Sequence, residues 1–333
     1  LVAVLVVTSL TGCATTETAS TPTWMPEKWD LSADVVVVGY GPAGAMAAKA
    51  AHEEGASTLI IEKESYEDSG GSAAVSMAYI FDFSPELLEH SSMGKVDSEL
   101  AEIIVDESRK SMDWLKETGL EFQGIIAEGY GPGLYEAVRK GIDSLGLQII
   151  YDTPAEELIF DPVTREVYGV KCTDKTGNVI NVKANKGVVL ATGGFVENED
   201  LVDRFIMPKG TGMVSAGAPS QTGDGLLMAL DAGAAIDGMT MFNMEWYGLA
   251  YKKASEEMDT AILHLINEGA IDARMFVNQD GNRFMDEETY IVHNKNQLPF
   301  LDYIGELNSG YPGWTNLPMY VIFDSSLADS APV

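Results

Sequence analysis

Basic side chains are scarce in this 333-residue chain. The sequence has 21 Lys and Arg against 51 Asp and Glu, which gives a formal net charge of −30. Such a surface repels a phosphate backbone, so we exclude nucleic acid as a partner. Cysteine is also scarce, with Cys13 and Cys172 as its two occurrences. A Cys-x-x-Cys-His motif and a cysteine cluster are both missing, which excludes a c-type haem or an iron–sulfur cluster held by this chain, and we predict no metal ligands.

Long hydrophobic runs are missing too. The apolar run over residues 1–7 is too short to span a membrane, and it leads into Leu10-Thr-Gly-Cys13. A short apolar core followed by small residues is typical of a processing signal, here residues 1–13. It resembles a bacterial lipoprotein signal, in which the cysteine is lipidated and becomes the first mature residue; the alternative is a plain secretory signal with a chance cysteine. We therefore expect Cys13 to carry a lipid anchor to the membrane and residues 14–30 to be a flexible tether. Cys172 would then be alone in the mature protein, which excludes an intramolecular disulfide.

A glycine motif follows the first strand pattern. The apolar run Asp34-Val-Val-Val-Val enters Gly39-x-Gly41-x-x-Gly44, and helix-forming residues come next. In a dinucleotide-binding turn the first glycine allows the tight bend, the second the approach of a pyrophosphate, and the third close helix packing. The helix N-terminus adds free N–H groups for phosphates. A second strand ends at Glu62, about 20 residues on, where an acid that binds ribose hydroxyls is expected. We predict a dinucleotide site, because an ordinary glycine-rich turn leaves Glu62 unexplained.

The remaining chain shows helix patterns and then strand patterns. Helices are expected over residues 97–119 and 132–145, each followed or closed by glycine. Strands are expected over 149–160, 166–173 and 179–182, joined by turns into an antiparallel meander. A buried strand from Lys186 and a helix after Gly223 follow. After about residue 233 the pattern loosens and Met and aromatic residues increase, which we interpret as an inserted capping domain.

Further glycine-rich loops follow these elements. Ser69-Gly-Gly-Ser72 can hold a phosphate or line a ring, although a simple turn is the alternative. Ala191-Thr-Gly-Gly194 lets backbone approach a second face of a ligand. Thr222-Gly-Asp-Gly225 places an acid at a helix start, and the stretch 276–287 predicts a hairpin that turns at Asp280-Gly281.

In this order, the motifs resemble those of the fumarate reductase/succinate dehydrogenase flavoprotein family, over about residues 33–328. More narrowly, they are similar to the branch with soluble fumarate reductases, urocanate reductases and 3-ketosteroid dehydrogenases. The resemblance implies an α/β fold, in which a Rossmann-like FAD-binding domain with an antiparallel β-meander carries an inserted α+β capping domain. It implies FAD as cofactor and hydride transfer between flavin N5 and one carbon of an activated C–C bond. The positions that match the family's cofactor residues are Gly39, Gly41, Ala43, Gly44, Glu62, Lys63, Gly70, Gly71, Ser72, Ala155, Ala191, Thr192, Gly193 and Asp224.

The catalytic positions match the family less well. Dicarboxylate reductases of the family carry an Arg that acts as the general acid, four residues after the Glu of the Arg-Phe-x-x-Glu motif. This chain has Ile291 at that position. They also carry a His-Pro where this chain has Asn243-Met244. Because two carboxylate-handling groups are missing, we do not expect fumarate as the substrate. Tyr290 is a candidate proton donor, since a phenol above a flavin can act as a general acid, and His293 is the second candidate. Each can instead be an ordinary residue of the capping domain.

The expected domains are a lipoprotein signal (1–13), a tether (14–30), the N-terminal part of an FAD-binding domain (31–235) and an incomplete capping and substrate domain (236–333). The sequence begins without Met or a basic region, and no further glycine-rich stretch follows the capping domain. We therefore expect this sequence to be a piece of a longer protein, and we expect substrate-binding residues beyond it.

These observations predict a lipid-anchored, extracytoplasmic FAD-dependent oxidoreductase of a bacterial cell surface or periplasm. We expect a reductase of a small-molecule organic electron acceptor. Cytosolic NADH cannot reach such an enzyme, so its electrons should come from a membrane-linked carrier or from an FMN or haem donor protein. Two alternatives stay open: a dehydrogenase of the 3-ketosteroid type, and a non-catalytic lipoprotein that binds FAD for electron transfer. An NAD-binding dehydrogenase would leave the loops at Thr192 and Asp224 unexplained.

Overall fold

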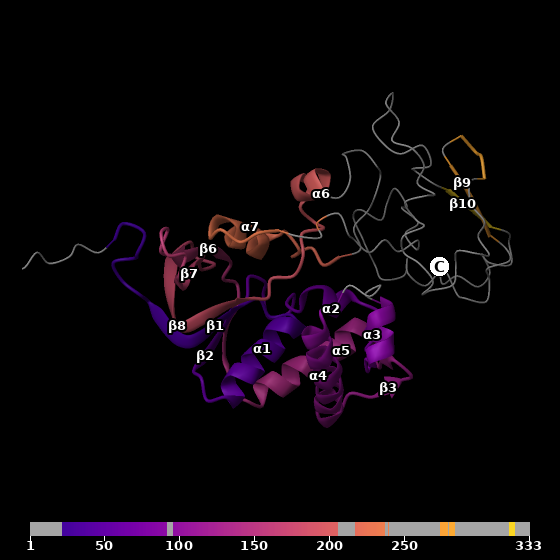
Figure 1. The fold of residues 1–333 in the computed structure, drawn as a ribbon, viewed down its shortest axis with the longest axis horizontal. Helices are drawn as coiled ribbons and strands as arrows, with labels where there is room; N and C mark the ends of the chain where they lie inside the picture. The colour runs from indigo at the N-terminus through magenta and orange to yellow at the C-terminus, as the bar shows by residue number, and fades with distance from the viewer. Residues whose placement is uncertain are drawn as a thin grey trace, which may run out of the picture.

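The computed structural model describes residues 22–91, 96–205, 217–236, 239, 274–278, 280–283 and 320–323. The strands are β1 (Leu31–Val38), β2 (Thr58–Ile61), β3 (Phe122–Gln123), β4 (Ile126–Ala127), β5 (Gln148–Ile150), β6 (Ala155–Phe160), β7 (Val167–Thr173), β8 (Val179–Leu190), β9 (Arg274–Val277) and β10 (Tyr320–Phe323). The helices are α1 (Pro42–Glu53), α2 (Gly71–Val75), α3 (Pro85–Ser91), α4 (Ser98–Glu117), α5 (Tyr130–Asp143), α6 (Glu199–Phe205) and α7 (Asp224–Asp231). Figure 1 shows their arrangement.

A six-stranded sheet forms the centre, in the order β5-β2-β1-β8-β7-β6. The pairs β2–β5, β1–β2 and β1–β8 are parallel, and α1 makes the crossover between β1 and β2. β6, β7 and β8 are antiparallel neighbours, which confirms the predicted meander. The predicted α/β, Rossmann-like fold is therefore confirmed. The capping domain lies mostly outside the described residues and stays a prediction; within it, β9 pairs with β10, and Val277 bridges Arg283 across the expected turn at Asp280-Gly281.

Two strand predictions need correction. The single strand expected over residues 149–160 is wrong, because this stretch forms β5 at one edge of the sheet and β6 at the opposite edge. Between them Asp152 has a φ of +51°, and its N–H donates to the carbonyl of Glu64, so the chain leaves the sheet there. The strands expected at residues 179–182 and from Lys186 are one continuous strand, β8. Its first half pairs with β7 and its second half with β1.

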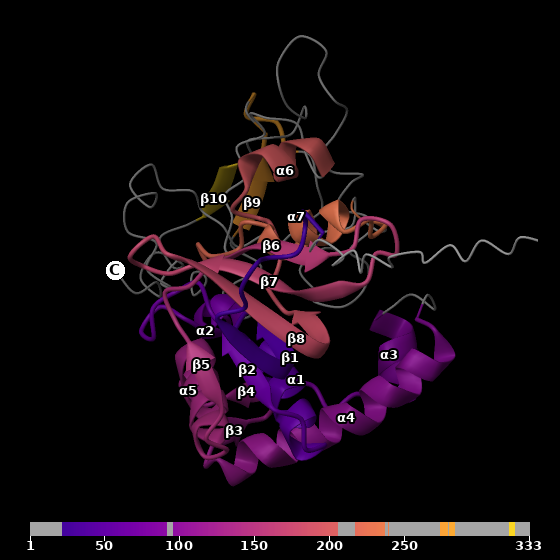
Figure 2. The same ribbon diagram turned by 90° about the vertical axis from the view of Figure 1, so that its left-hand side faces the viewer.

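The central strands β1 and β2 pack apolar side chains on both faces of the sheet, since successive side chains of a strand point to opposite faces. Val37 and Ile60 face a core formed with side chains of α1, α4 and α5. Figures 1 and 2 show these three helices on the same side of the sheet. Val36 and Leu59 face the other side, where Met228 of α7 packs. Strands buried on both faces require near-continuous apolar sequence, which Val-Val-Val-Val supplies in β1.

Residues 22–30 lie against the meander. The Trp24 ring lies 5.4 Å from that of Tyr168, and the N–H of Asp30 donates to the carbonyl of Asn181. This part of the expected tether therefore packs on the domain, while residues 1–21, including Cys13, lie outside the described part. Within the described ranges, the structure contains no helix with the length and apolarity needed to cross a membrane.

Candidate cofactor site

The predicted cofactor residues gather where the parallel strands end. Val38, the last residue of β1, lies between Ile61 of β2 and Leu190 of β8 in the sheet register. The residues that follow these three, Gly39, Glu62 and Ala191, therefore emerge side by side. In open α/β sheets this edge, outside the carboxyl ends of the strands, is where ligands bind.

The three glycines of the first turn have different surroundings. Gly39 has a φ of +101°, and a Cβ there would collide with the carbonyl of Ala191. A Cβ at Gly44 would collide with the carbonyl of Gly39, so this glycine lets α1 pack against the turn. Gly41 has an ordinary φ of −79°, and the nearest atom to a Cβ there, the Gly70 carbonyl oxygen, would be 3.7 Å away. The turn therefore leaves open space at its second glycine, where a pyrophosphate must approach.

Glu62 is buried and anchored by the backbone. Its Oε2 accepts the N–H of Tyr40 at 2.6 Å, and its Oε1 accepts the N–H of Glu64 at 2.8 Å. A carboxylate offers about four lone-pair positions, so about two remain for ribose hydroxyls. Thr153 donates its N–H to the Glu62 carbonyl, so the buried Ala155, two residues on at the start of β6, lies close to Glu62 in space.

The second glycine loop faces the first. Gly70 has a φ of +115° and precedes α2, while Gly71, with a φ of +54°, begins that helix and Ser72 follows it. Because the Gly70 carbonyl borders the open space at Gly41, the two loops form opposite sides of one cradle. Ala43, in the first turn of α1, is exposed.

A polar network joins two distant predicted residues. Lys63 Nζ lies 2.8 Å from both Asp224 Oδ2 and Thr222 Oγ1, and Thr222 Oγ1 donates to Asp224 Oδ1 at 2.7 Å. Thr192 packs against Gly225 in the first turn of α7. Gly193, which has a φ of +74°, lies beside Gln221. The loops at the ends of β2 and β8 are thus joined to the start of α7. The Lys63 and Asp224 side chains keep 25% and 34% of their surface exposed, so a ligand can still reach them.

The structure therefore gathers the predicted cofactor residues around the carboxyl ends of β1, β2 and β8, with Ala155 near them through the contact between Thr153 and Glu62. Their roles in binding stay predictions. Tyr290 and His293, with Ile291 and Asn243-Met244, lie outside the described residues, so the catalytic hypothesis stays a prediction as well.

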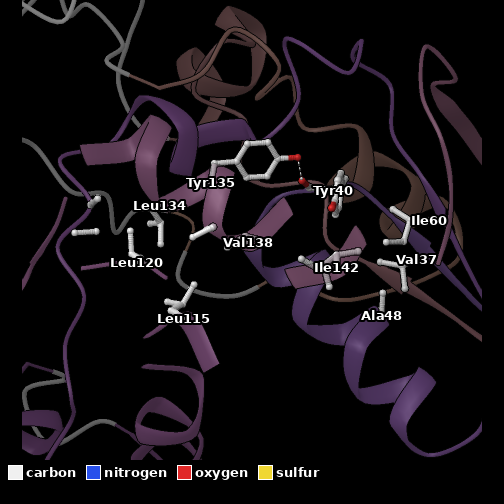
Figure 3. Close-up of a cluster of buried hydrophobic side chains, with 14 residues drawn as sticks. Val37, Tyr40, Ala48, Ile60, Leu115, Leu120, Leu134, Tyr135, Val138 and Ile142 are labelled. Atoms are coloured by element: carbon white, nitrogen blue, oxygen red, sulfur yellow. Dashed lines mark hydrogen bonds between the residues drawn. The ribbon is translucent and has the colours of Figure 1, made fainter. Parts of the chain in front are cut away.

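Three buried residues behind the cradle are absent from the predicted cofactor residues, although the sequence indicated the loop that begins at Ser69. They are Ser69, Tyr135 and Arg139, and they contact each other and the two glycine loops (Figure 3 shows Tyr135 and its bond to Tyr40). Burial raises the pKa of the Tyr135 phenol above its ordinary value, which further favours the protonated hydroxyl. A Tyr and an Arg four residues apart within an apolar helix pattern are the signal that could have indicated them.

These features fit FAD. No side chain fills the space at Gly41 where a pyrophosphate must approach, and the N-terminus of α1 follows directly. The carboxylate of Glu62, held by backbone N–H groups, lies about 20 residues after the glycine turn, where an acid that binds ribose is expected. The residues that would hold FAD are the glycines of both loops, for its phosphates, and Glu62, for its ribose.

The chain matches the family described as FAD binding domain over residues 34–130 and 126–311. It belongs to this family, and FAD is its cofactor.

Curated relatives show the same class of protein. The chain is 27% identical to a vinyl phenol reductase of Lactiplantibacillus plantarum over 298 residues, which are 79% of this chain and 58% of that protein. It is 29% identical to a fumarate reductase (cytochrome) of Shewanella frigidimarina over 328 residues, 89% of this chain and 53% of that protein. A solved 3-ketosteroid Δ1-dehydrogenase of Sterolibacterium denitrificans shares the fold with a TM-score of 0.68 at 18% identity, over 91% of this chain and 70% of that one. The chain thus spans about half the length of these two curated relatives.

Proposed function

We propose that this chain is the FAD-binding part of an oxidoreductase that reduces an activated C=C bond of a small organic electron acceptor. The observation that carries the proposal is the glycine cradle with its fixed Glu62, in a family where two relatives that match most of this chain are named as a vinyl phenol reductase and a fumarate reductase. Bound FAD, once reduced by an electron donor, would supply the hydride for such a reaction.

The chain's own residues have separate tasks in this proposal. The cradle at Gly41 and Gly70 binds the phosphates, and Glu62 orients the ribose, which fixes the cofactor along the sheet edge. Tyr290 donates the proton to the carbon next to the one that receives hydride, with His293 as the other candidate donor. Both assignments come from the sequence.

The substrate is proposed from what the sequence lacks. Ile291 and Asn243-Met244 stand where dicarboxylate reductases of the resembling branch carry an Arg and a His. Without these cations a dicarboxylate would lose its partners, so we propose an alkene conjugated to an aromatic ring or a single carbonyl group. A substrate of this type agrees with the name of the vinyl phenol reductase relative.

The location and the partners are also proposals. The sequence around Cys13 supports a lipid-anchored protein outside the cytoplasm. Its electrons would then come from a membrane-linked carrier, or from an FMN or haem protein. The cytochrome named in the Shewanella frigidimarina relative gives an example of such a donor.

The test is an assay of the full-length protein with a reduced viologen dye as donor. Vinyl phenol, a cinnamate, fumarate and a ketosteroid are offered as acceptors. We expect dye oxidation with the aromatic alkenes and little with fumarate. Failure with every alkene would overturn the reductase proposal, and ketosteroid oxidation with an artificial acceptor would instead support the dehydrogenase alternative.

The same assay tests the proton donor. Tyr290→Phe should lower the rate by about 10²-fold or more, which is the size of a general-acid contribution, without changing the FAD content. His293→Ala is the matched variant. If both variants and the wild type react at equal rates, neither residue is the proton donor.

A further inference from the structure

α5 carries two buried polar side chains beneath the cofactor cradle. Tyr135 and Arg139 lie four residues apart, so they share one face of the helix. They are 4% and 8% exposed. Figure 3 shows the Tyr135 hydroxyl directed at the backbone of Tyr40, away from the apolar side chains of the same helix.

One hydroxyl group connects the two glycine loops. Tyr135 donates to the carbonyl of Tyr40 at 2.8 Å, and its oxygen lies 3.1 Å from Ser69 Oγ. Tyr40 lies between the first two glycines of the first loop, and Ser69 immediately precedes Gly70. The Tyr135 hydroxyl therefore fixes the position of one loop relative to the other.

Arg139 binds the backbone and a side chain of the segment that leads into the second loop. Its Nη2 donates to the carbonyl of Tyr66 at 2.7 Å and to Ser69 Oγ at 3.2 Å. Its guanidinium lies 4.0 Å from the centroid of the Tyr66 ring, a cation–π distance. The planar guanidinium presents several donors in a fixed geometry and stacks on aromatic rings, so it can bind a carbonyl, a hydroxyl and a ring at once.

Close packing completes the contact between α5 and the second loop. A Cβ at Gly70 would lie 2.6 Å from the Tyr135 ring, so the loop rests directly on that ring. At the far end of α2, the N–H of Gly131 donates to the carbonyl of Ser76 at 2.9 Å. α5 thus supports the loop before, at and after Gly70.

We propose that α5 pre-organises the FAD cradle, with Tyr135 and Arg139 as positioning residues that act through the backbone of the two loops. Ordering loops during binding weakens affinity, so loops that are already connected bind the cofactor more tightly. This inference depends on FAD as the cofactor but not on the substrate proposed above.

The test is FAD binding to the apoprotein, measured by flavin fluorescence, with thermal unfolding of the apoprotein in parallel. Tyr135→Phe keeps the ring and removes the hydroxyl, and should weaken FAD binding about three- to tenfold, the effect of one hydrogen bond. Tyr151→Phe is the matched control. Its ring lies 6.1 Å from that of Tyr40, yet its hydroxyl makes no hydrogen bond within the described residues, so FAD affinity should not change.

A merely structural role predicts a different result. In that case Tyr135→Phe would lower the unfolding temperature and leave the FAD dissociation constant unchanged, which would overturn the proposal. Equal weakening by Tyr151→Phe would overturn it too. If Tyr135→Phe does not fold, Ser69→Ala removes the hydroxyl group that Tyr135 contacts in the second loop. An unchanged FAD affinity in Ser69→Ala would then contradict the proposal. Because no substrate is involved, these results are independent of the alkene assay.

Discussion

The glycines of the first turn differ in what a methyl group would meet. At Gly44 it would collide with the backbone of Gly39, whereas at Gly41 nothing but the Gly70 carbonyl lies within 4 Å. The backbone at Gly41 also has a φ of −79°, which any residue adopts. Gly44 is thus required by the fold itself. No contact with a described residue requires a glycine at position 41, so we attribute Gly41 to the proposed phosphate site.

This difference gives a prediction for two substitutions. Gly41→Ala should fold with a free energy of unfolding within about 0.5 kcal/mol of the wild type, as for an unstrained partly exposed site. It should still lose FAD affinity by about tenfold or more, because the methyl group enters the pyrophosphate space. Gly44→Ala should destabilise the apoprotein by about 1–3 kcal/mol, as overpacking does. Urea unfolding and fluorescence titration measure the two quantities.

Gly187→Ala is the control for both substitutions. Gly187 lies in β8 with open space around its Cβ position and an ordinary φ. Its substitution should change neither stability nor FAD affinity appreciably. If Gly41→Ala binds FAD as tightly as Gly187→Ala does, the open space at Gly41 does not hold the pyrophosphate.

At the scale of elements, local patterns predicted most strands and helices and the antiparallel meander, but not the division of residues 149–160 between two edges of the sheet. The alternation and apolarity of residues 149–160 indicated extended structure, and both β5 and β6 are extended. Their separation depends on the positive φ of Asp152 and on its bond to the distant Glu64, which no local period records. The N-cap at Asp97, in contrast, is a local signal, and its side chain accepts the N–H groups of Glu99 and Leu100 as a cap should.

The cofactor site shows the same division. Gly39, Gly41, Gly44 and Glu62 were predictable because their spacing along one βαβ unit is itself the signal. Tyr135 was not, because its contact with Tyr40 spans 95 residues and depends on how α5 packs under the sheet. Apolar periodicity indicates a buried face but does not say which backbone carbonyl a buried hydroxyl will reach.

β7 carries a buried thiol that makes stability depend on alkaline pH. Burial raises the pKa of Cys172 from its ordinary 9.0 to about 12. Above pH 9 the unfolded chain releases this proton and the folded chain keeps it, so the unfolded state binds fewer protons and stability falls as pH rises towards 12. Below pH 9 the thiol's contribution is constant. Each pH unit in this window corresponds to about 1.4 kcal/mol.

Comparison with Cys172→Ala isolates this effect, because the raised pKa values of Tyr40, Tyr135 and Tyr151 act equally in both proteins. Urea unfolding at about pH 8 and about pH 10 should show a larger loss of stability in the wild type than in Cys172→Ala. If the free energy of unfolding falls equally in both proteins, the folded and unfolded states do not differ in the pKa of the Cys172 thiol.

At the scale of the whole molecule, an anionic cofactor binds a chain with a net charge of −30. Lys63, the basic side chain in the predicted set, is already paired with Asp224. Backbone N–H groups at the turn and at the start of α1 must therefore supply most of the attraction for the phosphates. The positions of the two loops, which α5 fixes in our proposal, therefore determine how these N–H groups meet the phosphates.

The proposed membrane anchor can be tested on the whole protein in its bacterial host. A lipoprotein-type modification joins the lipid to a thiol, so Cys13→Ser should lose fatty-acid labelling and move the protein from the membrane fraction to the soluble fraction. Cys172→Ser is the matched control, since it exchanges the same atoms at a buried site on β7 and should leave the protein in the membrane fraction.

Residues 22–30 pack on the meander, so the eight residues between Cys13 and Pro22 would extend at most about 30 Å. An anchored domain would therefore keep its meander close to the lipid surface. If Cys13→Ser stays with the membrane as the wild type does, the lipid anchor is wrong.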